Sequence, residues 1–122
     1  MFNFEKLEVW NKAVSFANLV YRLTGSYPAD ERFGLTNQMR RAAVSISSNI
    51  AEGSSRNSKS DYARFVELAT GSVFEVASQS FISKQQKILS LEDFNLIYAS
   101  AEELSRMLTG LRAYLIDRAA SN

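Results

Sequence analysis

Residues 90–115 read SLEDFNLIYASAEELSRMLTGLRAYL, and this stretch decides the fold. Ser90 and Asp93 form a signature typical of a helix N-terminus, in which a serine side chain accepts from a backbone amide three residues later. The apolar residues that follow are spaced alternately by three and four positions, which predicts one buried helix face: Phe94, Ile97, Ala101, Leu104, Leu108, Leu111 and Leu115. The stretch therefore predicts a long amphipathic helix that begins near residue 90.

Three further stretches show the same helical spacing. The first should end at Gly25, the second should begin with the acidic turn Asp30-Glu31 and end at Gly53, and the third should begin at the capping signature Ser58 to Asp61. The expected buried positions are Leu7, Trp10, Val14, Ala17 and Tyr21 in the first, Leu35, Met39, Ala42, Ile46 and Ile50 in the second, and Tyr62, Phe65, Ala69, Ser72 and Val76 in the third.

The four predicted helices define an all-α fold. No stretch alternates apolar and polar residues with a period of two, so we expect no strands. The links between helices are short, which forces neighbouring helices to run antiparallel. The sequence therefore predicts one domain over residues 1–122, an antiparallel up-down-up-down four-helix bundle.

Composition argues against enzyme chemistry. The 122 residues contain no Cys and no His, which removes thiolate nucleophiles, imidazole bases and nearly every zinc or di-iron ligand set. Glu67 and Glu75 could share a helix face, but we interpret them as surface or paired glutamates rather than as a hydrolytic site. We expect no catalytic residue, no metal and no cofactor. The charged N-terminal segment and the lack of a long apolar run predict a cytoplasmic protein without a membrane segment.

The third helix carries more apolar residues than one bundle face can bury. Beside its first stripe lies a second one that contains Val66, Val73 and Phe81, and Phe74 adds to this surplus. Exposed apolar stripes on a folded protein usually mark an interface. We therefore predict a homo-oligomer whose interface includes Val66, Val73, Phe74 and Phe81.

Polar residues occur where a plain core would carry leucine. Heptad spacing from Leu35 points the Asn49 amide into the bundle, where it needs partners. Gly71 lies in the middle of the third helix, where a glycine suggests a close approach to another helix. We predict a structural network of hydrogen bonds between helices that contains Gln38, Asn49, Ser72 and Glu75.

Basic residues are concentrated in the middle of the chain, although the formal net charge is only +1. From Arg32 to Arg64 there are six basic residues and only two acidic ones, Glu52 and Asp61. Such residues often form a merely solvated face, but they could also contact phosphates. The candidate nucleic-acid-binding residues are Arg40, Arg41, Arg56, Lys59 and Arg64.

Residues 38–53, QMRRAAVSISSNIAEG, together with Phe33-Gly34-Leu35 before them and Ala69 to Ser72 and Glu75 after them, resemble a known family. This family is the four-helix bundle proteins encoded in 23S rRNA intervening sequences. The resemblance implies a cytosolic bundle that assembles into a homopentameric ring and implies no enzyme. The family is in turn similar to the accessory variability proteins of diversity-generating retroelements, whose basic rings engage a reverse transcriptase and nucleic acid.

Two functional interpretations remain open. In the first, the protein is a ring-shaped RNA-binding or ribonucleoprotein accessory factor whose basic residues contact phosphates. In the second, the ring is a protein-interaction scaffold with an unknown protein partner and no nucleic-acid binding. Phosphate binding should weaken steeply as salt rises, whereas an apolar protein interface should hardly respond, so salt dependence distinguishes the two interpretations.

Overall fold

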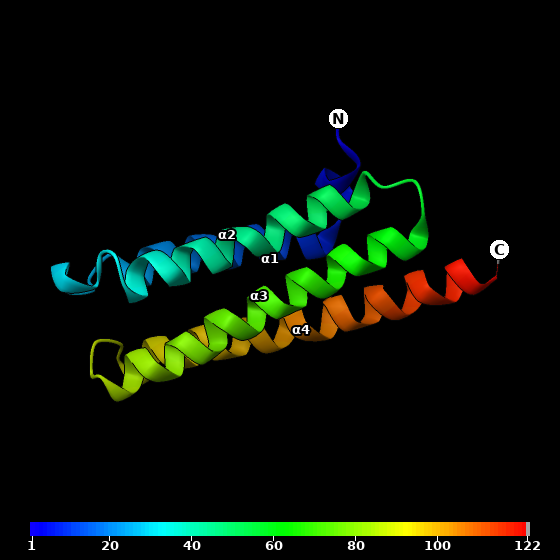
Figure 1. Ribbon diagram of the computed structural model, residues 1–122. Coiled ribbons are helices and arrows are strands. Elements are labelled where there is room, and N and C mark those ends of the chain that lie inside the picture. Colours follow the sequence, from blue (N-terminus) through cyan, green and yellow to red (C-terminus); the bar gives the residue numbers. More distant parts are fainter. Residues whose placement is uncertain (122) are drawn as a thin grey trace.

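The computed structural model describes residues 1–121, which form helices and connecting turns without a strand in that range. The elements are two 3-10 turns, Asn3–Lys6 and Ala29–Glu31, and the helices α1 (Glu8–Thr24), α2 (Leu35–Ser54), α3 (Lys59–Gln85) and α4 (Leu91–Ala120). Figure 1 shows the helices as two antiparallel pairs, with both chain ends at the same end of the bundle as the α2–α3 turn. Each long helix contacts two others in a closed order, α1 with α2, α2 with α3, α3 with α4 and α4 with α1. The predicted up-down-up-down four-helix bundle is therefore confirmed.

Serine caps fix the starts of α3 and α4. The Ser58 hydroxyl accepts from the Asp61 amide at 3.0 Å, and the Ser90 hydroxyl accepts from the Asp93 amide at 3.1 Å. Each bond satisfies one of the amides that a helix N-terminus leaves without an intrahelical partner. Both predicted helix starts are confirmed.

The start of α2 lies later than predicted. The acidic residues Asp30 and Glu31 belong to the separate 3-10 turn, and α2 begins at Leu35. The Glu31 carboxylate instead accepts from the Leu35 amide at 3.0 Å. Glu31 thus stabilises the N-terminus of α2 from outside the helix. Its negative charge alone predicts a position in the first turn of the helix, because acidic residues are favoured there.

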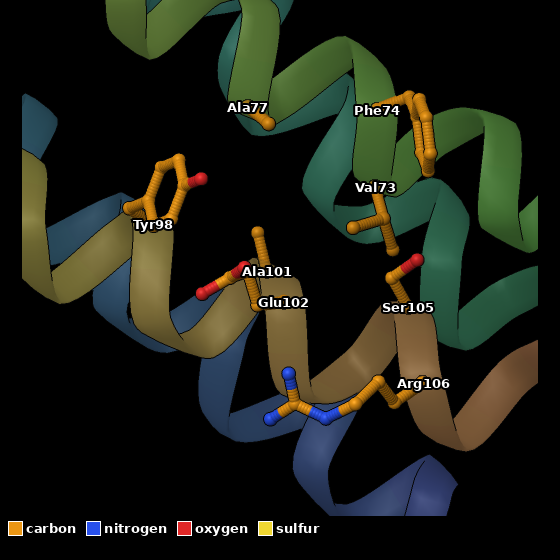
Figure 2. A pocket seen from close by; sticks show the side chains of 8 residues that line it. All are labelled: Val73, Phe74, Ala77, Tyr98, Ala101, Glu102, Ser105 and Arg106. Atoms are coloured by element: carbon orange, nitrogen blue, oxygen red, sulfur yellow. The ribbon is translucent and has the colours of Figure 1, made fainter.

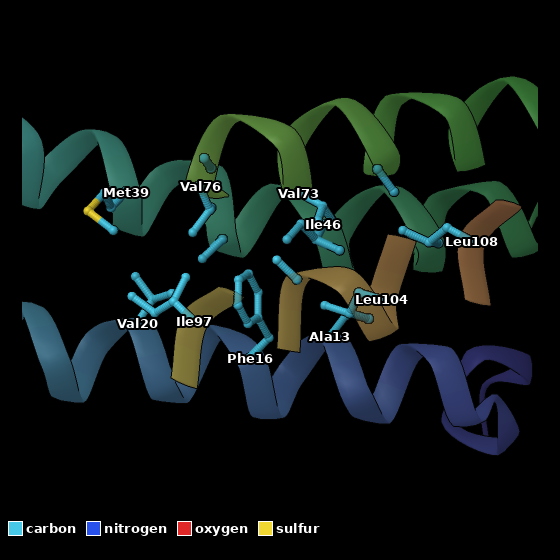
Figure 3. Packing of buried hydrophobic residues seen from close by; sticks show 14 of the residues in the cluster. Ala13, Phe16, Val20, Met39, Ile46, Val73, Val76, Ile97, Leu104 and Leu108 are labelled. Carbon is cyan, nitrogen blue, oxygen red and sulfur yellow. The ribbon is translucent and has the colours of Figure 1, made fainter. Parts of the chain in front are cut away.

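The core agrees with prediction along α2 and α4. Met39, Ala42, Ile46 and Ile50 of α2 are buried. Six of the seven predicted positions of α4 are buried, and the seventh, Leu111, packs partly buried against the same cluster. Figure 3 shows side chains from all four helices, including Phe16, Ile46, Val76 and Leu104, meeting between the two helix pairs.

The buried face of α1 differs from the predicted one. The buried apolar residues are Val9, Ala13, Phe16, Val20 and Leu23, while Tyr21 of the predicted stripe is exposed. Both sets have helical spacing, so periodicity alone cannot choose between them. Trp10 lies at the rim, where its ring contacts that of Phe4 with centroids 4.7 Å apart.

Val66 and Val73, which we predicted at an oligomer interface, belong to the core of the single chain. Their exposed fractions are 0% and 1%, so both side chains are buried within a single chain. The physical reason is that α3 packs on both α2 and α4 and therefore needs a broad apolar arc rather than one narrow stripe. Phe74 and Phe81 lie beyond this arc and are 63% and 41% exposed.

The close approach of helices occurs at Gly53 rather than at Gly71. A Cβ atom added to Gly71 would meet nothing within 4 Å, whereas one added to Gly53 would lie 2.8 Å from the Cβ of Phe65 and 2.9 Å from Cδ1 of Tyr62. The glycine that ends the 38–53 stretch therefore lets the N-terminal part of α3 pack against the end of α2.

We expect the protein to lose stability at alkaline pH because of Tyr27. Burial raises the pKa of its phenol, and the nearby carboxylates of Asp93 and Glu31 raise this pKa further. The folded state therefore holds the proton to higher pH than the unfolded chain does. This contribution to the free energy of unfolding is fully present below about pH 10, the pKa of an unfolded tyrosine, and is lost as pH rises through the folded pKa. Urea unfolding over a pH series should show a smaller alkaline loss for Tyr27→Phe, and identical pH profiles would contradict this assignment.

Candidate functional site

The five predicted nucleic-acid-binding residues lie in two separate groups. Arg40 and Arg41 are in the first third of α2, whereas Arg56, Lys59 and Arg64 surround the α2–α3 turn at the other end of that helix. At 1.5 Å per residue, roughly 20 Å of helix separates the two groups. One chain therefore does not bring the five residues together into a single basic patch.

The guanidinium group of Arg40 binds the C-terminal end of α1. Its Nε donates to Oγ1 of Thr24 at 2.9 Å, its Nη2 donates to the carbonyl oxygen of Tyr21 at 3.3 Å, and its guanidinium lies over the Tyr21 ring at 4.6 Å. The last carbonyls of a helix lack intrahelical donors and carry partial negative charge, so a cation here stabilises the helix end. The structure thus gives Arg40 a structural role.

Arg41 has a different environment although it is the next residue. It is exposed and forms no hydrogen bond or ion pair with the described residues. Its side chain lines two neighbouring grooves, one between α2 and α3 and one beside Tyr21 and Val44. Arg41 is therefore the cation of this pair that is available to a ligand.

Arg56 and Arg64 are held by neighbouring side chains at the α2–α3 turn. Arg56 pairs with Glu52 at 2.8 Å and with Asp61 at 3.6 Å, and Arg64 pairs with Asp61 at 3.1 Å. Both guanidinium groups also lie over the ring of Phe65, at 4.6 and 4.5 Å from its centroid. The two carboxylates thus neutralise much of the predicted basic surface.

Lys59, the first residue of α3, is exposed. Among residues 1–121 it forms no ion pair with a carboxylate. Together with Arg41, it leaves two of the five predicted residues without a partner in the described chain.

The predicted polar residues form two separate sets rather than one network. Asn49 donates to the carbonyl and the hydroxyl of Ser45 at 2.9 and 3.0 Å, and the Ser72 hydroxyl donates to the Ser45 hydroxyl at 3.0 Å. Gln38 lies apart from this set and accepts from Nε2 of Gln79 at 3.2 Å. Glu75 has no hydrogen bond to any described residue.

Ser45 and Gln79 are the residues that sequence reasoning missed. Ser45 precedes Asn49 by four residues, and Gln79 follows Glu75 by four, so each lies on the same helix face as a predicted member. The spacing of four residues could therefore have predicted that both residues take part in these hydrogen bonds. Asn49 is satisfied within α2, which is why it does not reach across the bundle as expected.

A polar groove runs between α2 and α3, with a volume of about 340 Å³. We call it the α2–α3 groove. Its lining combines amides, hydroxyls, one guanidinium and one carboxylate: Asn37, Gln38, Arg41, Ala42, Ser45, Ser72, Glu75 and Gln79.

A second groove of about 310 Å³ lies between α3 and α4, and we call it the α3–α4 groove. Figure 2 shows Val73, Phe74 and Ala77 on one side of it and Tyr98, Ala101, Glu102, Ser105 and Arg106 on the other. Phe74 and Tyr98 expose apolar surface here, and Phe81 joins Tyr98 and Phe94 in an aromatic cluster next to it, with ring centroids 4.8 to 6.2 Å apart. These exposed aromatic rings distinguish the α3–α4 groove from an ordinary helix surface, which carries mainly polar side chains.

Metal and membrane signals are both absent from the part of the chain that the structure describes. No group of three or more Asp or Glu side chains there could hold a metal ion. No helix within residues 1–121 has both the length and the apolar character that a bilayer crossing requires.

We expect Arg40→Ala to destabilise the fold and Arg41→Ala to leave it nearly unchanged. The first change leaves the end of α1 without its charged donor, at a cost of about 1–2 kcal/mol in the free energy of unfolding. The second removes an exposed side chain, which changes stability by at most about 0.5 kcal/mol. Chemical denaturation of the two variants checks this pair, and equal losses would contradict the separate roles.

Comparison with known proteins identifies a family and solved structures of similar fold. The family model for the 23S rRNA-intervening sequence protein matches residues 5–110. A solved structure of a protein of unknown function from the S23 ribosomal protein family of Bacteroides thetaiotaomicron VPI-5482 is similar, with a TM-score of 0.77 and 20% sequence identity over 85% of this chain and 97% of that one. No curated protein matches the chain. At this identity the structural similarity shows a shared fold.

Proposed function

Because this chain belongs to the 23S rRNA-intervening sequence protein family, we propose that it is a non-enzymatic bundle protein that self-associates and binds RNA. The family's description mentions 23S rRNA, which fits an RNA-associated role. Under this proposal the protein acts in the cytoplasm, as an RNA-binding or ribonucleoprotein accessory factor.

Self-association through the α3–α4 groove is the first part of the proposal. The exposed rings of Phe74 and Tyr98 line this groove, the ring of Phe81 lies next to that of Tyr98, and exposed apolar surface of this kind usually belongs to an interface. A second copy of the chain that covers the groove would remove these rings from water. A closed ring, with five subunits as the resemblance implies, repeats this contact around its axis.

The RNA-binding part of the proposal rests on the contrast between Arg41 and the other three arginines of the predicted set, Arg40, Arg56 and Arg64. Arg41 is exposed without a partner in the described chain, while Arg40, Arg56 and Arg64 are held by intramolecular contacts. Of the five predicted residues, only Arg41 and Lys59 lack a partner in the described chain, so this set offers two free cations per chain and its affinity for phosphates is weak. Repetition in an assembly lets several weak contacts act on one RNA molecule and raises the overall affinity.

Fluorescence anisotropy with a labelled structured RNA over a salt series tests the proposal. We expect the logarithm of the affinity to fall linearly as the logarithm of the salt concentration rises. We also expect Arg41→Glu to bind the RNA at least about tenfold more weakly than the unchanged protein. Lys12→Glu is the matched control, since it makes the same charge change where Lys12 pairs with Glu103, between α1 and α4. Absence of binding at low salt, or equal losses in the two variants, would overturn the RNA-binding proposal.

The protein-interaction scaffold is the second candidate, and one observation favours it. The carboxylates of Glu52 and Asp61 neutralise Arg56 and Arg64, so the turn between α2 and α3 presents little net positive charge. A scaffold of this kind would bind its partner through the apolar surface with little dependence on salt. Salt-insensitive association would therefore favour this candidate.

A further inference from the structure

The two walls of the α2–α3 groove carry opposite hydrogen-bonding chemistry. Arg41 on α2 offers several N–H donors and no acceptor. Glu75 on α3 offers only acceptors, and Gln79 lies one turn further along the same face. Between them, the hydrogen bond from Ser72 to Ser45 joins the two helices within the lining of the groove.

Several polar groups that line the groove form no hydrogen bond with another described residue. Gln79 donates through Nε2 to Gln38, but its Oε1 atom is buried and accepts no hydrogen bond from the described residues. Arg41 and Glu75 have no partner among residues 1–121, although both line the groove. The Oε1 atom of Gln79 therefore adds an acceptor to the groove beside the carboxylate of Glu75.

We propose that the α2–α3 groove binds one unpaired guanine base of the RNA, a step that rests on the proposed function. Guanine presents O6 and N7 as acceptors on one edge, which a guanidinium binds with two hydrogen bonds. Its N1–H and N2–H groups are donors on the adjacent edge and match the two oxygens of a carboxylate. Arg41 then binds O6 and N7 from the α2 wall, while Glu75 accepts from N1 and N2 on the α3 wall.

The same arrangement discriminates against the other bases. Adenine carries an amino donor at N6 where Arg41 needs an acceptor, and its N1 is an acceptor that faces the carboxylate of Glu75. Pyrimidines lack N7 and so lose one of the bonds to Arg41. A groove of about 340 Å³ lies within the size range of small-ligand sites, and unpaired bases are the usual targets of sequence-specific RNA recognition.

Binding of short uridine-rich RNA strands that differ at one central base tests this proposal. We expect the strand with guanosine to bind at least about tenfold more tightly than the strand with adenosine, and inosine, which lacks the N2 amino group, to fall between them. Glu75→Gln should remove the preference for guanosine, because an amide offers one acceptor where the carboxylate offers two. Glu67→Gln is the matched control, a carboxylate of α3 outside this groove, and should keep the preference.

A titration with guanosine monophosphate, followed by the backbone amide signals in an NMR spectrum, separates this proposal from the proposed function. The expected shifts are confined to residues 37–45 and 72–79 and are absent with adenosine monophosphate. Salt-dependent RNA binding without a preference for guanosine, or no shift in these segments, would overturn the guanine site and leave the proposed function standing. Shifts in the groove without any binding of structured RNA would support the site and remove the proposed function.

Discussion

Replacing Phe74 with glutamate is expected to convert the proposed assembly into monomers and to lower the affinity for RNA by about 10²- to 10⁴-fold. Phe74 is 63% exposed in a single chain and lies at the α3–α4 groove, so under the proposed self-association its ring contributes to the interface and little to the core. A carboxylate buried there against a second copy would lose its water without gaining a partner. The individual contacts with phosphates would persist, but they would no longer act together on one RNA molecule.

Light scattering after size-exclusion chromatography, over a wide range of protein concentration, measures this effect, and anisotropy measures the affinity. Ile82→Glu is the matched control, since Ile82 is an exposed apolar residue of α3 that does not line the groove. We expect this control to keep the assembly and the affinity. An unchanged mass for Phe74→Glu would show that the interface lies elsewhere.

Gly53→Val is expected to lower the free energy of unfolding by at least about 2 kcal/mol. Its Cβ atom would lie 2.8 Å from the Cβ of Phe65 and 2.9 Å from the ring of Tyr62, distances at which the two helices must move apart. The displaced Phe65 ring also supports Arg56 and Arg64, so the α2–α3 turn would lose order with the core.

Gly110→Ala is the control for this prediction. Nothing lies within 4 Å of a Cβ atom added at Gly110, which is inside α4. Alanine there should raise the free energy of unfolding by about 0.5–1 kcal/mol, because glycine is the poorer helix former. Urea unfolding of both variants provides the measurement, and a stable Gly53→Val protein would contradict the close approach at this residue.

The fold could be predicted from the sequence because the strongest pattern lies in the longest helix. The regular spacing from Phe94 to Leu115 has one apolar face, so only one orientation of α4 buries it. In α1 two apolar faces overlap, and the choice of Phe16 over Tyr21 depends on the helices that α1 meets. In α3 the burial of Val66 follows from contact with two neighbours, which no single helix pattern encodes.

The site was less predictable because its properties depend on side-chain contacts between helices. Arg40 and Arg41 are equivalent in the sequence, yet only Arg40 reaches the end of α1. The partners of Asn49 and Gln38 likewise follow from rotamers and helix register. Sequence spacing places residues on a face, but it does not say which of them remain free for a ligand.

Sedimentation velocity of the protein with a labelled structured RNA, at low and at high salt, tests self-association and RNA binding in one experiment. We expect an assembly of several subunits that carries the RNA at low salt, and the same assembly without RNA at high salt. A mass equal to one chain at every concentration, or RNA that sediments independently of the protein at low salt, would contradict this expectation.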